Sequence, residues 1–253
     1  AWKSGLHDAI EKLRDSLGSG PILLTNGQNT AWKWANGQLD EDYPNRYVNG
    51  KKGFEATKGF MEQWKGKVEH EPVTNAIWVY GTGEKDWQSM RYGLASAAMF
   101  DAYFAWSVAG EPQHRSPHWF DEYSAELGKP TGPAKEISPD IWRRDFEQGV
   151  IVLNSGRLSQ WVDLENDFIK IDGDQDWFIN NGKTVSKALL KSKDGLVLLN
   201  SEESLPTQTE TESATNPEEI EDDTQSEETG EEITPVSRIQ FININDFFKN
   251  FFN

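Results

Sequence analysis

The sequence contains no cysteine. Disulfide bonds, zinc–thiolate centres and a cysteine nucleophile are therefore excluded. It also lacks an apolar run near the eighteen residues that a membrane-spanning helix needs, so no membrane span is predicted. The glycine-containing segment 81–87 has neither the spacing of a phosphate-binding loop nor its Lys-Ser/Thr end, and a Gly-x-Ser-x-Gly nucleophile motif is absent.

Basic residues are scarce. The formal net charge is −17, and residues 201–236 hold thirteen acidic side chains and no basic ones. Such a charge balance argues against nucleic acid and anionic membranes as partners, whereas a neutral sugar meets no electrostatic barrier. Residues 201–235 are also nearly free of apolar side chains, which predicts a disordered acidic linker. The aromatic tail 236–253 is interpreted first as the start of a truncated domain, with a docking peptide and a sequencing artefact as the alternatives.

Tryptophan, in contrast, is abundant. All eleven tryptophans lie between Trp2 and Trp177. An indole N–H needs a partner when it is buried, so this number predicts flat stacking surfaces in addition to a core. Most of the eleven are nevertheless expected in the core.

Apolar periodicity predicts three helices, over residues 4–17, 51–69 and 86–101. In the first, Ser4 is the expected N-cap. Its apolar face is expected to consist of four side chains, Leu6, Ile10, Leu13 and Leu17.

Three short apolar runs that end near Gly predict strands, and a short acidic segment at 37–43 is interpreted as a strand that ends in carboxylates. The candidate strands cover residues 21–27, 37–43, 76–83 and 102–110. Alternation of strands and helices is typical of parallel β/α architecture. At most four strands fit, however, whereas a closed eight-stranded barrel takes about 250 residues.

From Trp142 onward the pattern changes to β-type runs separated by Gly, Asp and Asn. An Asp-Gly turn stands between apolar runs at 191–199. Residues 141–200 are therefore predicted to form a small antiparallel β domain.

Several segments resemble a bacterial family known as hypothetical glycosyl hydrolase family 15, within the α-galactosidase-like group of barrels. The likeness covers about residues 1–200 and keeps the family's order. It is carried by PILLTNG (21–27), NGQLDEDYP (36–44), RYGLASAAMFDAYFAW (91–106), HWFDEYSAELGKPTGP (118–133), WRRDFEQGVIVLN (142–154) and the stretch from Gly173 to Leu199.

The resemblance implies the C-terminal part of a (β/α)8 TIM barrel in residues 1–140, followed by a β-sandwich-like domain in 141–200. In the wider group, the nucleophile is an Asp at the end of the fourth strand, and the proton donor ends the sixth. The sixth strand here ends in Asp40, Glu41 and Asp42. The fourth would precede Ala1, so the nucleophile half of the site is expected to be missing.

Two carboxylates carry out glycoside hydrolysis without a cofactor, and barrel enzymes place them at the carboxyl ends of strands. Glu41 is the first choice for the general acid and Asp40 the second. Repulsion among adjacent acids, together with partial burial, is expected to raise a pKa, as a general acid requires. The alternative is a solvated turn without a role.

Other side chains near strand ends are candidates for contacts with sugar, because aromatic rings pack on sugar C–H faces and polar groups bond hydroxyls. Asn26 could equally serve a turn, Trp106 is more typical of a core, and an acidic pair at 121–122 fits a helix start even better than a sugar contact. The full set is Asn26, Trp32, Trp34, Tyr43, Trp106, Trp119, Asp121 and Glu122.

Metal binding is not expected. His114 and His118 are four residues apart, close to the acidic pair, but Pro112 and Pro117 oppose the regular helix that would align them.

The sequence thus predicts a retaining glycoside hydrolase acting on oligo- or polysaccharide, extracellular or at the cell surface. Two alternatives remain open: a glycan-binding or surface-display module without catalysis, and an inactive gene fragment. Because four strands leave two sheet edges open, association with a missing N-terminal half or a half-barrel dimer is expected.

Overall fold

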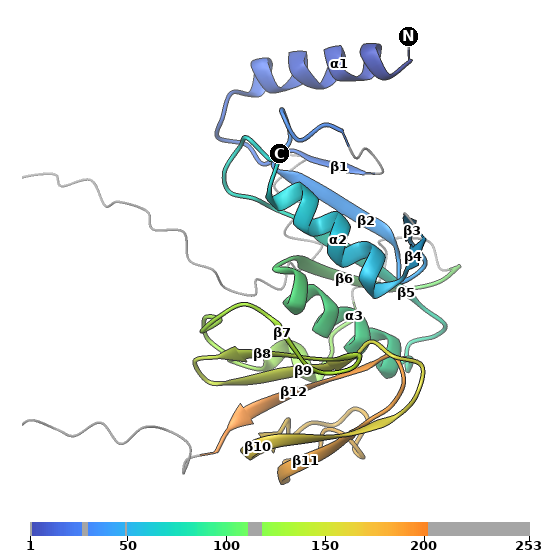
Figure 1. The fold of residues 1–253 in the computed structure, drawn as a ribbon, viewed down its shortest axis with the longest axis vertical. Helices are drawn as coiled ribbons and strands as arrows, with labels where there is room; N and C mark the ends of the chain where they lie inside the picture. Colours follow the sequence, from blue (N-terminus) through green and yellow to red (C-terminus); the bar gives the residue numbers. More distant parts are fainter. Residues whose placement is uncertain (1, 27–29, 49, 111–117, 202–253) are drawn as a thin grey trace, which may run out of the picture.

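A computed structural model of the chain describes residues 2–26, 30–48, 50–110 and 118–201. The calls on the linker 201–235, the tail 236–253 and His114 fall outside this part, apart from Ser201. The structure contains two main sheets with one helix between them (Figure 1). No helix in the described ranges is long and apolar enough to cross a membrane.

The first sheet is parallel and has four strands in the order β1-β2-β5-β6. Their bounds are β1 Leu24–Asn26, β2 Gly37–Tyr43, β5 Ala76–Gly81 and β6 Tyr103–Val108. All four predicted strands are therefore present, and the first is much shorter than its apolar run. The sheet is open, so a closed barrel is not seen in the described residues.

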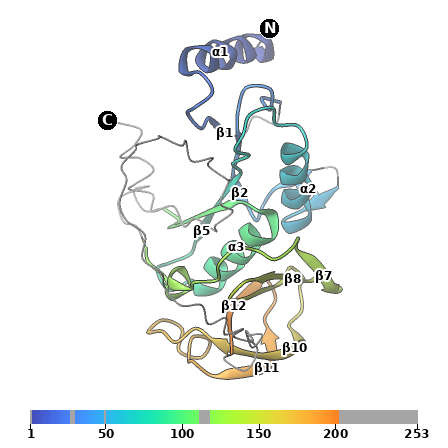
Figure 2. The same cartoon turned by 90° about the vertical axis from the view of Figure 1, so that its left-hand side faces the viewer.

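Two helices cover one face of this sheet, α2 (Phe54–Lys65) and α3 (Trp87–Phe100) (Figures 1 and 2). The predicted apolar stripe of α2 is buried against the sheet, with Trp64 fully enclosed. Asp86 caps α3, since its carboxylate accepts from the backbone N–H of Ser89. A short hairpin that sequence reasoning missed, β3 (Tyr47–Val48) and β4 (Lys51–Lys52), precedes α2.

Helix α1 (Trp2–Leu17) differs from expectation. It begins before Ser4, which lies inside the helix, so the predicted N-cap is wrong. Leu13 and Leu17 of the predicted apolar face are 45% and 43% exposed. The buried residue is Arg14, whose guanidinium donates to backbone carbonyls of other segments and to the side chain of Asn36.

The second sheet is antiparallel and curls into a half-barrel with strand order β11-β10-β12-β9-β8-β7. It begins at Lys135, within the segment that sequence analysis assigned to the barrel half. The strand bounds are β7 Lys135–Ser138, β8 Ile141–Phe146, β9 Gly149–Asn154, β10 Gln160–Lys170, β11 Thr184–Leu190 and β12 Asp194–Asn200.

Helix α3 lies between the two sheets (Figure 2). Every residue from Met90 to Phe100 is buried. A single apolar cluster runs from the parallel sheet through α3 to Trp142, Ile151 and Val197 of the second sheet, and a smaller cluster fills the other side of that sheet. Gly195 permits the close approach, because a Cβ there would lie 2.5 Å from the Cβ of Ala95.

Candidate functional site

The face of the parallel sheet opposite α2 and α3 carries the predicted acid. Strand pairing places Asn26 beside Leu39 and Tyr80 beside Ser107. The register of β2 against β5 shifts between Asp40 and Tyr43, so strict alternation ends before Tyr43. Glu41 precedes Tyr43 and lies close enough to Tyr80 for its charge to act on that phenol. Asn26 and Glu41 are exposed. We call this surface the open face; its residues are Asn26, Leu39, Glu41, Ala76, Trp78, Tyr80, Tyr103, Ala105 and Ser107.

An aromatic wall stands beside Glu41. The rings of Trp78 and Tyr80 stack with centroids 5.9 Å apart and planes 16° apart. The Trp78 indole N–H donates to Ser107 Oγ at 2.9 Å, which satisfies that N–H and fixes the ring. Partial burial raises the pKa of Tyr80, and the negative charge of Glu41 raises it further. The Glu41 carboxylate therefore lies within electrostatic reach of this wall, near the carboxyl ends of three strands.

Asp40 lies on the opposite face from Glu41 and is fully buried. Its carboxylate accepts two hydrogen bonds from the Arg46 guanidinium, at 2.7 and 2.9 Å, and one from Thr57 Oγ1 at 3.0 Å. Strand alternation places the side chains of Asp40 and Glu41 on opposite faces of the sheet. Such a bidentate buried pair favours a structural role for Asp40, which joins β2 to α2.

Tyr43 and Trp106 also face the helices. The Tyr43 hydroxyl and Ser96 Oγ are 2.5 Å apart, and burial raises the Tyr43 pKa well above its usual value. The Trp106 ring is 4% exposed and packs edge-on against Phe120. Their contact with substrate stays a prediction. In the structure, both side chains pack in the apolar core.

Trp32 and Trp34 are both half-buried. The Trp32 ring lies edge-on to Trp64 of α2. The Trp34 indole N–H donates to Glu11 of α1 at 3.3 Å. Both rings thus help to hold the loop 30–36 between two helices.

Asp121 and Glu122 open a short 3-10 helix, Asp121–Ser124, so they stand at a helix start. Asp121 accepts from the Gln175 backbone N–H at 2.8 Å, and Glu122 accepts from Asn180 Nδ2 at 3.1 Å. Burial raises the pKa of Glu122. Both acids are engaged by the loop of the second sheet, and the neighbouring Trp119 is 60% exposed.

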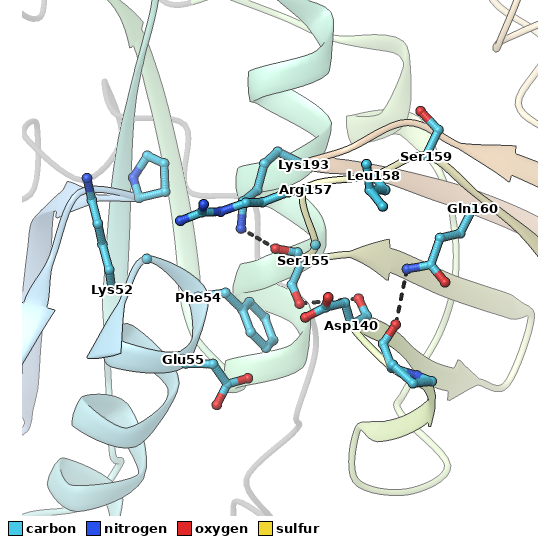
Figure 3. Close-up of a pocket in the computed structure, with 14 residues that line it drawn as sticks. Lys52, Phe54, Glu55, Asp140, Ser155, Arg157, Leu158, Ser159, Gln160 and Lys193 are labelled. Atoms are coloured by element: carbon cyan, nitrogen blue, oxygen red, sulfur yellow. Dashed lines mark hydrogen bonds between the residues drawn. The ribbon is translucent and has the colours of Figure 1, made fainter. Parts of the chain in front are cut away.

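A separate open cleft of about 860 Å³ lies between the N-terminus of α2 and the turns of the second sheet (Figure 3). Lys52, Arg157 and Lys193 bring positive charge to it, and Glu55 and Asp140 bring negative charge. Burial lowers the pKa of Lys193, whose ammonium group bonds Ser155 O and lies 3.3 Å from the Tyr92 hydroxyl. Sequence reasoning missed this cleft, because its walls come from segments up to about 150 residues apart, with no local signal.

No group of three or more His, Asp and Glu side chains in the described ranges is arranged to hold a metal ion.

Residues 1–150 match the model of a family described as hypothetical glycosyl hydrolase family 15. This range includes both covering helices and all four strands of the parallel sheet. No curated protein matches the chain.

Proposed function

Because the chain belongs to the hypothetical glycosyl hydrolase family 15, we propose that it contributes the general acid/base to a glycoside hydrolase acting on oligo- or polysaccharide. The carrying observation is the position of Glu41. It is an exposed carboxylate on the open face, near the carboxyl edge of a parallel sheet and beside the Trp78–Tyr80 wall. Carboxyl ends of strands are where β/α enzymes hold their chemistry.

The proposed reaction is retaining. Glu41 protonates the glycosidic oxygen while a second carboxylate attacks the anomeric carbon, and Glu41 then takes a proton from the water that releases the sugar. Tyr80 would face the sugar ring, supported by the stacked ring of Trp78, which is itself 6% exposed, and Asn26 would bond a hydroxyl. No cofactor enters these steps.

The second carboxylate is proposed to come from outside the four strands. Among strand residues whose side chains the structure describes on the open face, Glu41 is the one carboxylate. We propose that the parallel sheet is part of a (β/α)8 barrel, with the antiparallel sheet that begins at Lys135 as the attached β domain. The remaining strands would then bring the nucleophile about 5–5.5 Å from Glu41, as retention requires.

Glu41→Gln in the intact protein tests the assignment. The amide cannot donate the proton, so hydrolysis of unactivated oligosaccharides should fall about 10²–10⁴-fold. A dinitrophenyl glycoside, whose leaving group needs no proton, should lose far less in the glycosylation step. Glu84→Gln, an exposed acid in the loop after β5, is the control. Equal rates for Glu41→Gln and the unaltered protein would reject Glu41 as the acid.

A glycan-binding module without turnover is the second candidate. It is favoured by the burial of Asp40 in its ion pair, which leaves a single described carboxylate on the open face. Saturable glycan binding without product in the same assay would support it.

A further inference from the structure

Residues 172–181, which we call the aromatic loop, carry two large apolar side chains into solvent. Trp177 is 66% exposed and Phe178 is 67% exposed. Their rings stack on one another with centroids 3.7 Å apart and planes 27° apart. Exposing this much ring surface forgoes the stabilisation that burial would give, so the arrangement calls for an explanation.

Hydrogen bonds to α3 and within the turn itself hold the aromatic loop in place. The Asp176 carboxylate accepts from the Arg91 guanidinium of α3 at 2.6 Å, where Arg91 is 3% exposed. The backbone carbonyl of Asp176 accepts from the N–H groups of Ile179 and Asn180, at 2.7 and 2.9 Å. Asp176 itself adopts a left-handed conformation, with φ 43°. The exposed rings are therefore carried by a tight turn, and the buried Arg91 guanidinium holds that turn through Asp176.

A second set of hydrogen bonds ties the aromatic loop to residues 119–122. The Gln175 side chain accepts from Asp121 N–H at 3.3 Å and donates to the carbonyl of Trp119 at 2.9 Å. Asn180 Nδ2 donates to Asp121 and Glu122. Gly173 permits this contact, because a Cβ there would lie 2.2 Å from Asp121 Oδ2. Trp119, 60% exposed, thus shares one rigid scaffold with the loop.

This scaffold adjoins β6 of the proposed active site. Phe120, next to Trp119, packs against Trp106 with ring centroids 5.0 Å apart. Trp106 lies in the carboxyl-terminal half of β6. Trp106 faces the helices, so the scaffold is joined to the side of β6 opposite the open face, and a ligand that contacts both must pass around the carboxyl end of β6.

We propose that Trp177 and Phe178, with Trp119 on the same hydrogen-bonded scaffold, form a glycan-stacking subsite, which rests on the proposed hydrolase function and extends its substrate site. Pre-positioned flat rings lose little conformational entropy on binding and suit the C–H face of a sugar. Nucleic-acid bases also stack on such rings, but they need a basic groove, whereas this loop carries Asp172, Asp174 and Asp176. Asp121 and Glu122 become positioning residues that hold the scaffold and do not touch sugar.

The test measures binding separately from hydrolysis. The full chain is run through native gels containing soluble starch, xylan, galactomannan or dextran, and the dissociation constant is taken from its retardation. We expect one polysaccharide to retard the chain, and Trp177→Ala with Phe178→Ala to weaken that binding at least about tenfold. The change should not alter the thermal midpoint, because both side chains are exposed and the anchoring bonds use backbone groups and other side chains.

Trp161→Ala is the matched control, because Trp161 is a 72% exposed tryptophan on β10, opposite Leu189 of β11. Its binding should remain unchanged. Absence of retardation by all four polysaccharides, or equal weakening by Trp161→Ala, overturns the subsite. The subsite is also overturned if the double variant keeps its affinity for polysaccharide but no longer forms a dimer that the unaltered chain forms in analytical ultracentrifugation. The rings would then serve a contact between two copies of the chain.

Failure of the hydrolase proposal is distinguishable. Glu41→Gln should lower turnover about 10²–10⁴-fold and leave polysaccharide retardation intact. Retardation that depends on Trp177 and Phe178 without any hydrolysis supports the subsite and rejects only the catalytic role of Glu41.

Discussion

Asp40 and Glu41 are joined by one peptide bond, yet their side chains lie on opposite faces of the parallel sheet. Asp40 is fully buried and paired with Arg46, while Glu41 is exposed beside the aromatic wall. Because neighbouring strand residues point to opposite faces, Asp40 can have a structural role while Glu41 has the proposed chemical one.

Asp40→Asn should destabilise the fold, whereas Glu41→Gln should not. The first change leaves the Arg46 guanidinium without its charged partner, at a cost of about 3 kcal/mol. The free energy of unfolding in urea checks this. Glu62→Gln, which removes the exposed pair with Lys58, is the control and should cost about 0.5 kcal/mol or less. Similar losses for Asp40→Asn and Glu62→Gln would contradict a structural role for Asp40.

Arg91→Met should weaken the junction between α3 and the second sheet. The Arg91 guanidinium donates to Asp194 at 3.0 Å and to Asp176 at 2.6 Å, and the change leaves these carboxylates unpaired. We expect a loss of about 3–5 kcal/mol, measured by urea unfolding. Lys65→Met removes an exposed ion pair with Asp101 and should change little. A variant as stable as the unaltered protein would show that the pair is dispensable.

Glu122→Gln should change how stability depends on pH. Burial raises the Glu122 pKa above its usual 4.5, against the hydrogen bonds and the Arg91 charge that oppose the rise. The folded state thus holds this proton more tightly than the unfolded chain. Its contribution is complete below the usual pKa and is lost as pH rises through the folded pKa.

The Gln side chain cannot ionise, and its amide oxygen can still accept from Asn180. The difference in unfolding free energy between variant and unaltered protein should therefore shift in favour of the variant between pH 4 and pH 7. Chemical denaturation at several pH values measures it. Parallel pH profiles for the two proteins would argue that Glu122 has no raised pKa.

Gly195→Ala should destabilise the contact between α3 and β12. The new methyl group would lie 2.5 Å from Ala95 Cβ and 2.6 Å from the Arg91 carbonyl oxygen, so the helix must move, at about 1–3 kcal/mol. Gly59→Ala in α2 is the matched control, because a Cβ there meets nothing within 4 Å. It should stabilise by up to about 1 kcal/mol. Thermal midpoints of the two variants should shift in opposite directions.

Local patterns predicted the elements of the parallel sheet well. Gly, Asn and a capping Asp bound strands β5 and β6 and helices α2 and α3. Each of these elements buries the side that its own apolar periodicity indicates. The family resemblance was confirmed for residues 1–150. Such features depend on neighbours in sequence, so the sequence alone is sufficient to find them.

Contacts between distant segments could not be predicted. Arg14 replaces the expected leucines as the buried residue of α1 because its carbonyl partners come from other turns of the chain. Arg91 and Asp194 are 103 positions apart. The aromatic loop likewise depends on bonds between residues 121–122 and 175–180, which no spacing rule indicates.

Helix α3 has no solvent side over its last eleven residues, since one sheet covers it from each direction. The two sheets therefore share one apolar core through α3. Cutting the chain between the sheets would leave an apolar surface on both pieces. The described part of the molecule should accordingly lose its structure in one cooperative transition. A fragment ending near residue 140 would keep its sequence pattern and lose its solubility.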